Sequence, residues 1–177
     1  MGELIEIVFE NIGKNSLTSF LTELSDFGRN IKNYYISSGY GHDTKIDWQN
    51  SDSVSEGLEK ISEGSMFVNL NALNTGSIPI RGCSLRIIHY DTDFDLEINF
   101  DSEDIPSLPD GRKMENVLHD FAVKTARKYG ITDFYGGIEP AVDADTRFFT
   151  CENVGPLAPI YVLPDKMRTV THQLSES

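Results

Sequence analysis

Asp91, Asp93 and Asp95 have the spacing of the first three ligands in a calcium-binding EF-hand loop. However, Leu96 stands where that loop needs a glycine, and Ser102 stands where it needs a bidentate glutamate. The segment also alternates between apolar and polar residues, as a strand with one buried face does. We therefore interpret these acids as side chains on a solvated strand face, and not as metal ligands.

A second group of carboxylates, Glu139, Asp143 and Asp145, follows the glycine pair Gly136 and Gly137. These acids could bind a metal ion or act as an acid and base pair. A Gly-Gly pair followed by Glu-Pro is more typical of a turn after a strand, and a catalytic pair needs an orienting partner that the sequence does not identify. The preferred interpretation is a loop with ordinary surface charges.

Other groups of residues are weaker evidence for catalysis or metal binding. Asp26, Asp43 and Lys45 resemble a metal-dependent nuclease arrangement, but a nuclease should present basic surface to phosphates, and the chain has a net charge of -13. Cys83 and Cys151 form no disulfide framework or thiol-enzyme signature. None of the four histidines has the paired spacing of a zinc site; they are His42, His89, His119 and His172. We place His119 on the outer side of a helix. The sequence thus predicts no catalytic residue, metal site or cofactor.

The segment 33–50 holds large aromatic residues among small polar ones: Tyr34, Tyr35, Tyr40 and Trp48. Recognition loops use this mixture because rigid aromatic side chains supply contact area with little loss of entropy. Alternatively, residues 34–36 form a strand and Trp48 belongs to the core. The sequence leaves both interpretations open.

The acidic charge is concentrated in two segments. Residues 87–111 contain eight acids and no Lys or Arg, and residues 129–146 contain four acids and no Lys or Arg. Concentrated charge creates a directional field that can steer an oppositely charged partner, and it disfavours nucleic acid and anionic membranes as partners. The predicted partner-binding residues are therefore Asp93, Asp95, Glu97, Asp101, Glu103, Asp104, Tyr135, Glu139, Asp143 and Asp145.

The elements that position these residues follow from periodicity. Apolar residues at three- and four-residue spacing predict helices over 114–129 and 16–27, with Gly130 and Gly28 as their stops, and a short helix near 54–61. Alternation predicts strands at 4–9, 66–70, 78–90, 94–100, 131–138, 147–150 and 160–163. On the strand 94–100, apolar residues occupy one face and the acids the other.

These elements predict an α+β fold. We expect a two-layer sandwich with a largely antiparallel sheet covered by two main helices, in a ferredoxin-like topology. Residues 1–165 should form one domain and residues 166–177 a loose tail. No apolar run is long enough for a membrane helix, and the acidic start is unlike a signal peptide, so we expect a cytoplasmic protein.

In size, acidity and absence of catalytic motifs the chain resembles bacterial immunity proteins of contact-dependent inhibition and other polymorphic toxin systems. The stretch Tyr135-Gly136-Gly137-Ile138-Glu139-Pro140, followed by Thr146-Arg147-Phe148-Phe149, carries this resemblance most strongly. The resemblance implies a non-catalytic protein whose partner is a basic toxin domain, often a nuclease. Two alternatives remain: a small metal-dependent hydrolase using Glu139, Asp143 and Asp145, and a housekeeping interaction domain.

Overall fold

The computed structural model describes residues 2–37, 44–61, 64–108 and 112–152. Its strands form one seven-stranded sheet in the order β2-β3-β4-β5-β1-β6-β7, and every neighbouring pair is antiparallel. In chain order the elements are β1 (Leu4–Ile12), α1 (Lys14–Leu24), β2 (Ile31–Ile36), α2 (Ser51–Glu59), β3 (Ser65–Asn74), β4 (Pro79–Tyr90), β5 (Asp93–Asp101), η1 (Ser102–Asp104), α3 (Met114–Tyr129), β6 (Asp133–Ile138), η3 (Ala144–Thr146) and β7 (Arg147–Thr150).

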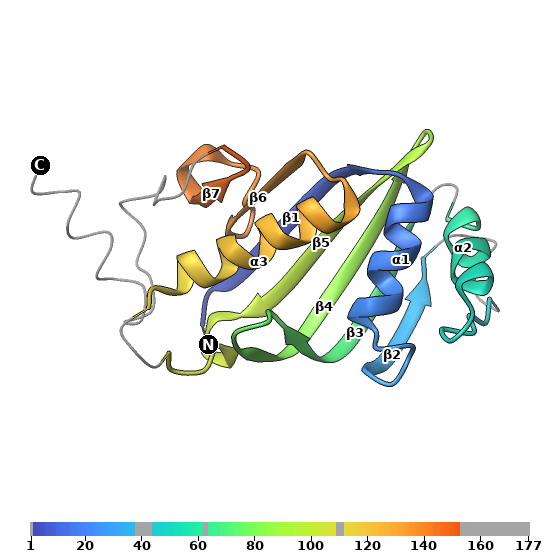
Figure 1. Ribbon diagram of the computed structural model, residues 1–177, viewed down its shortest axis with the longest axis horizontal. Helices are drawn as coiled ribbons and strands as arrows, with labels where there is room; N and C mark the ends of the chain where they lie inside the picture. Colours follow the sequence, from blue (N-terminus) through green and yellow to red (C-terminus); the bar gives the residue numbers. More distant parts are fainter. Residues whose placement is uncertain (1, 38–43, 62–63, 109–111, 153–177) are drawn as a thin grey trace, which may run out of the picture.

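The helices form a second layer on one face of this sheet. Helices α1 and α3 lie across the face, and α2 packs beside α1 (Figure 1). Buried side chains of both layers form one core; Phe9 of β1, for example, meets Phe20 of α1 edge to face at 5.5 Å. The predicted α+β sandwich with a largely antiparallel sheet is confirmed, whereas the ferredoxin-like topology is not confirmed by this strand order.

Helix α3 has the bounds that its periodicity predicts. Its apolar stripe is buried, and Gly130 ends it with φ 67° and ψ 32°, a left-handed conformation that glycine adopts without steric cost. Arg127 and Lys128 lie in its last turn, where positive charge is favourable. No α-helix among the described residues is long and apolar enough to cross a membrane.

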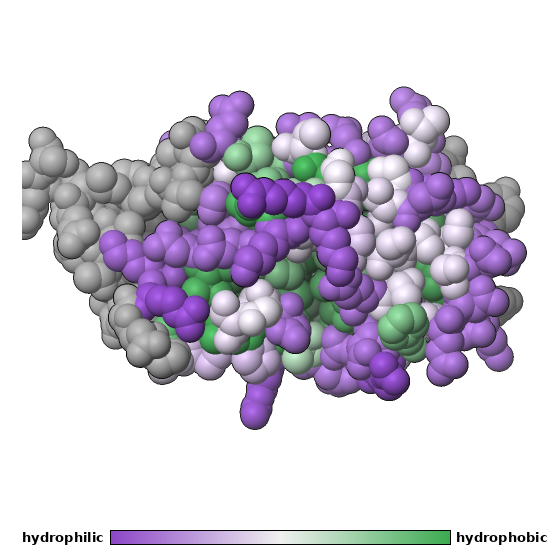
Figure 2. All heavy atoms as spheres, in the orientation of Figure 1, coloured by the Kyte–Doolittle hydropathy of each residue, from purple (hydrophilic) through white to green (hydrophobic). Residues whose placement is uncertain are grey.

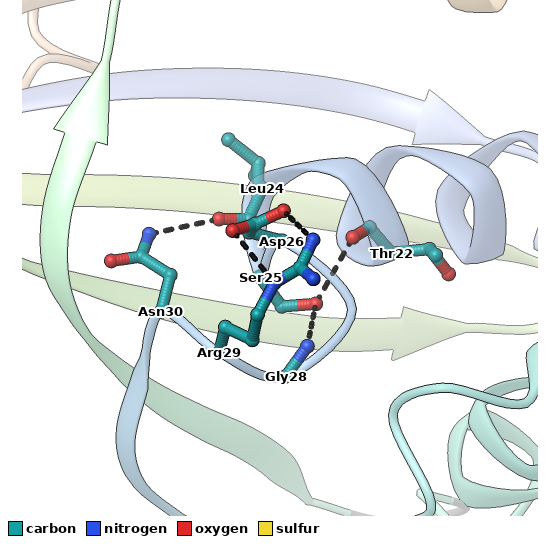
Figure 3. A network of polar contacts seen from close by, with 7 residues as sticks. All are labelled: Thr22, Leu24, Ser25, Asp26, Gly28, Arg29 and Asn30. Atoms are coloured by element: carbon teal, nitrogen blue, oxygen red, sulfur yellow. Dashed lines mark hydrogen bonds and ion pairs between the residues drawn. The ribbon is translucent and has the colours of Figure 1, made fainter.

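Helix α1 is shifted from the predicted 16–27, because it begins earlier, at Lys14, and ends earlier, at Leu24. Asp26, Phe27 and Gly28 all have positive φ, which a right-handed helix cannot contain. Hydrogen bonds hold this turn: the Asn30 amide donates to the carbonyl of Leu24 at 3.0 Å, and Arg29 pairs with Asp26 at 2.8 Å (Figure 3).

The strands follow the predicted alternation, with longer bounds for β1 and β3 and a later start for β6, at Asp133. The segment 34–36 lies within β2. The predicted strand 160–163 and the predicted tail 166–177 lie outside the described residues.

The helix-covered side of the molecule is mostly hydrophilic (Figure 2). A hollow of about 780 Å³ lies between α1 and α3, and hydrophobic side chains such as Phe20, Leu24 and Phe121 line it. The opposite face of the sheet has no described α-helix over it (Figure 1). We call that side the open face; it carries the side chains that alternate with the core residues of each strand.

Candidate partner-binding surface

Strand β5 places a row of carboxylates on the open face. Phe94, Leu96, Ile98 and Phe100 point into the core and are at most 2% exposed. Asp93, Asp95, Glu97 and Asp101 alternate with them and are half-buried. The predicted apolar and acidic faces of this strand are therefore confirmed, but its acids are less exposed than a solvated face implies. The reason is that β5 lies inside the sheet between β4 and β1, whose side chains shield it.

Strand β1 joins the two acid-rich segments of the sequence. It pairs with β5 on one side and with β6 on the other, so that Val8 lies opposite both Glu97 and Tyr135. Directly opposite residues in a sheet point to the same face, so Tyr135 also lies on the open face. Glu6 and Glu10, which alternate with the core residues of β1, add two more carboxylates between the segments.

The turn after β6 is fixed to this face by side chains. The Glu6 carboxylate accepts a hydrogen bond from the Ala141 amide at 2.8 Å. Arg147 donates to the carbonyls of Ala141 and Val142 at 2.9 and 2.7 Å. Its guanidinium carbon also lies 4.7 Å from the centre of the Tyr135 ring. The turn carries three exposed acids, Glu139, Asp143 and Asp145, of which Glu139 lies near Glu97 of the open face.

A hollow of about 610 Å³ opens between the acids of β5 and this turn. The predicted residues Glu97, Asp101, Asp104 and Glu139 line it together with Arg86 and Asn99. Asp143 and Asp145 do not line it, and neither does Glu103, which is exposed on η1 beside Asp104. Four of the nine predicted acids thus line one hollow.

Burial and mutual repulsion raise the pKa of the carboxyls at the centre of the open face. Burial is the largest cause for Glu6, Glu10, Asp95 and Glu97. Neighbouring carboxylates add to it, as Asp95 does for Glu10 and Glu97. Arg86, whose guanidinium lies 3.4 Å from the Glu97 carboxylate, opposes the rise for Glu97. The ionised form of these carboxyls is therefore energetically unfavourable, and a nearby cation would stabilise it.

Tyr135 responds to the same field. Burial, followed by the charges of Glu10 and Glu6, raises the pKa of its hydroxyl to about 12. The phenol therefore stays protonated at neutral pH and can serve as a hydrogen-bond donor on the open face.

The aromatic residues of segment 33–50 divide between the two interpretations. Trp48 is 7% exposed, and its ring meets that of Tyr34 edge to face at 5.4 Å. The Tyr34 hydroxyl accepts a hydrogen bond from the Ile46 amide at 2.8 Å, so both rings have core roles. Tyr35 points the other way and is 55% exposed. Tyr40 lies outside the described residues.

Asp26 and Cys83 lie in environments that do not favour metal or thiol chemistry. Within the described ranges, no three His, Cys, Asp or Glu side chains are placed to hold a metal ion. Asp26 is paired with Arg29, and its proposed partner Asp43 lies outside the described residues. Burial raises the pKa of the Cys83 thiol to about 12, which suppresses the reactive thiolate.

The described histidines have packing roles. His119 was expected on the outer side of its helix, but its ring packs edge to face on Phe149 at 5.2 Å, and burial lowers its pKa. The Nδ1 atom of His89 lies 2.8 Å from the carbonyl of Ile61, and its ring stacks on Phe94. His42 and His172 lie outside the described residues.

Sequence reasoning missed Glu6, Glu10 and Arg86 as members of this surface. The alternation of Glu6 and Glu10 with buried residues in β1 was a usable signal for their face. Their position beside β5, however, depends on a pairing between residues about a hundred positions apart, such as Leu4 with Asp101.

Comparison with known proteins decides the family. The family model described as PABL017 Cdi1I immunity protein matches residues 3–154. The chain belongs to this family. The resemblance to bacterial immunity proteins is thereby confirmed, and the match spans every strand of the sheet that carries the open face.

A solved structure shares the fold of this family member. A chain in the crystal structure of the toxic C-terminal tip of CdiA from Pseudomonas aeruginosa in complex with immune protein aligns with a TM-score of 0.68 at 23% sequence identity. The alignment covers 89% of this chain and 99% of that chain. Comparison with the curated proteins gives no match.

Proposed function

We propose that this immunity protein neutralises the toxic C-terminal tip of a CdiA protein by covering a basic surface of that tip with its open face. Two findings support a toxin partner: membership of the immunity family, and a shared fold with a chain from a complex of a CdiA tip with its immune protein. The protein acts by binding, without catalysis, and does so in the cytoplasm.

The observation that carries the proposal is the state of the carboxylates on the open face. Glu10, Asp95 and Glu97 are half-buried, mutually repelling and raised in pKa. A partner that brings lysine or arginine side chains to this face relieves the repulsion. This relief makes the free energy of binding more favourable. Close charge pairs across protein interfaces couple by about 1.5 to 7 kcal/mol.

A nuclease fits this role best among toxins. An enzyme that binds nucleic acid must neutralise phosphates with lysine and arginine. A protein surface with clustered carboxylates can occupy the same cationic groups. The predicted partner-binding acids Asp93, Asp101, Glu103, Asp104, Glu139, Asp143 and Asp145 extend the negative field around the central ones, and Tyr135 adds a donor.

The test is a charge-neutralised variant with a charge-matched control. The open-face triple variant is Glu10→Gln, Asp95→Asn and Glu97→Gln, in which each amide keeps the shape and acceptor oxygen of the acid it replaces. The control triple variant is Asp52→Asn, Glu56→Gln and Asp120→Asn, whose exposed acids lie on α2 and α3. Both triples change the net charge equally. Binding is measured by calorimetry to the C-terminal tip of the CdiA protein that we expect to be encoded beside this gene.

We expect the open-face triple variant to bind at least about 10-fold more weakly than wild type, which corresponds to about 1.4 kcal/mol. The control triple variant should bind within about twofold of wild type, since exposed charges far from an interface contribute little. Equal binding by the open-face triple variant and the wild type would show that the tip binds another surface. Equal weakening by both triples would show that only net charge matters.

A further inference from the structure

The open face carries a second kind of surface beside the acids. One residue from each strand lies in direct register across the whole sheet: Tyr35, Phe67, Arg86, Glu97, Val8, Tyr135 and Thr150. Because opposite residues point to one face, this row forms a continuous strip. Its β2 to β3 end is aromatic, and its centre at β5 is acidic.

Side-chain contacts link the aromatic end to the acidic centre. The rings of Tyr35 and Phe67 stack with centroids 4.9 Å apart and an interplanar angle of 15°. The guanidinium carbon of Arg86 lies 5.9 Å from the centre of the Phe67 ring, and the same group pairs with Glu97. The Phe67 ring is thus held between Tyr35 and Arg86, so its orientation is set before any partner arrives.

We propose that Tyr35 and Phe67 bind an apolar side chain of the same toxin whose basic residues meet the carboxylates of β1 and β5. This inference rests on the proposed function and adds the chemistry and the orientation of the partner. Tyr35 is 55% exposed although its ring is fixed by stacking, and exposed, rigid aromatic side chains are the usual anchors of protein interfaces.

Arg86 determines which way round the toxin docks. Its positive charge lies between the aromatic end and the acidic centre of the row and repels a basic residue of the toxin from the aromatic end. The cations are therefore directed to Glu10, Asp95 and Glu97, and the aromatic end is left for an apolar group. Such a two-part surface selects a toxin that carries its apolar side chain beside its basic cluster, and rejects a protein that is merely basic.

The experiment compares Tyr35→Ala with Phe27→Ala in binding to the adjacent CdiA tip. Phe27 is a matched control because it is 51% exposed and lies in the turn between α1 and β2. We expect Tyr35→Ala to weaken binding about 10- to 30-fold, the size of an interface anchor, at both low and high salt. Phe27→Ala should bind within about twofold of wild type. Thermal unfolding of each variant checks that the fold is kept.

Salt dependence separates the two proposals. The open-face triple variant should reduce the dependence of affinity on salt, whereas Tyr35→Ala should leave that dependence unchanged, because an apolar contact is not screened by ions. Binding by Tyr35→Ala at wild-type strength overturns the apolar anchor, even if the charge variant weakens binding and the proposed function stands. If neither variant weakens binding, the open face itself is excluded. The variant Tyr35→Phe, which keeps the ring, should restore at least half of the lost affinity in logarithmic terms.

Discussion

Gly137, in the strand that carries Tyr135, is packed closely against the backbone of residues 146 and 147. A Cβ atom at this position would lie 2.1 Å from the carbonyl oxygen of Thr146 and 2.8 Å from the Cα atom of Arg147, which are backbone atoms that cannot move aside alone. We expect Gly137→Ala to lower the free energy of unfolding by about 1 to 3 kcal/mol, as overpacking does. Denaturant unfolding measures this change. Gly13→Ala, where a Cβ meets nothing within 4 Å, should change it by less than about 1 kcal/mol.

Single residues also show the limits of the alternation pattern. The pattern correctly places Asp95 and Glu97 opposite the core residues of their strand, but it treats them as fully solvated. In the structure Asp95 accepts a hydrogen bond from the Asn11 amide at 3.0 Å, and Glu97 pairs with Arg86. These contacts come from other strands, so no local pattern contains them. Replacing either acid by lysine would therefore disturb the sheet as well as its charge, which is why amide replacements are the better probes.

At the scale of elements, the features set locally could be predicted. Both ends of α3 follow from its periodicity and from Gly130, and the two faces of β5 follow from its alternation. The end of α1 could not be placed, because the left-handed residues before Gly28 break no hydrophobic pattern. The order of strands could not be deduced either, since the pairing of β1 with β5 and β6 depends on contacts across most of the chain. The acids of β1 were missed for that reason.

Strands β1 and β5 together should give the protein a characteristic pH dependence. The pKa values of Glu10, Asp95 and Glu97 are higher in the folded than in the unfolded chain. Their contribution to stability is therefore fully present below the unfolded values of 4.5 and 3.8 and is lost as the pH rises through the folded values. We expect the open-face triple variant to be more stable than wild type at about pH 8, with the difference shrinking toward about pH 4.

Chemical unfolding of both proteins at several pH values measures this difference. Comparing the two cancels the contributions of groups that they share, including His119, whose lowered pKa acts in the opposite direction. A difference that stays constant with pH would contradict the raised pKa values. Because a cation on this face lowers those pKa values again, association with the toxin should release protons at mildly acidic pH.

For the whole molecule, the placement of charge matters more than its total. The net charge of -13 is gathered largely in two segments, and the fold sets them on either side of β1. An oriented field of this kind accelerates association with a basic partner by about 10- to 1000-fold. We expect the association rate with the adjacent CdiA tip to fall steeply as salt increases. The control triple variant should keep that rate and the open-face triple variant should lose it, as stopped-flow mixing at several salt concentrations can show.

The central position of β1 also governs when protection can begin. This strand is synthesised before the other described strands of the sheet, yet its two neighbours, β5 and β6, start only at Asp93 and Asp133. Until both have left the ribosome, the apolar residues Ile5, Ile7 and Phe9 have no completed sheet to join. At about 5 to 20 residues per second, synthesis from the start of β1 to the end of β6 takes roughly 7 to 27 s. The surface made by β5, β1 and β6 is therefore complete only after the last of these strands has been made.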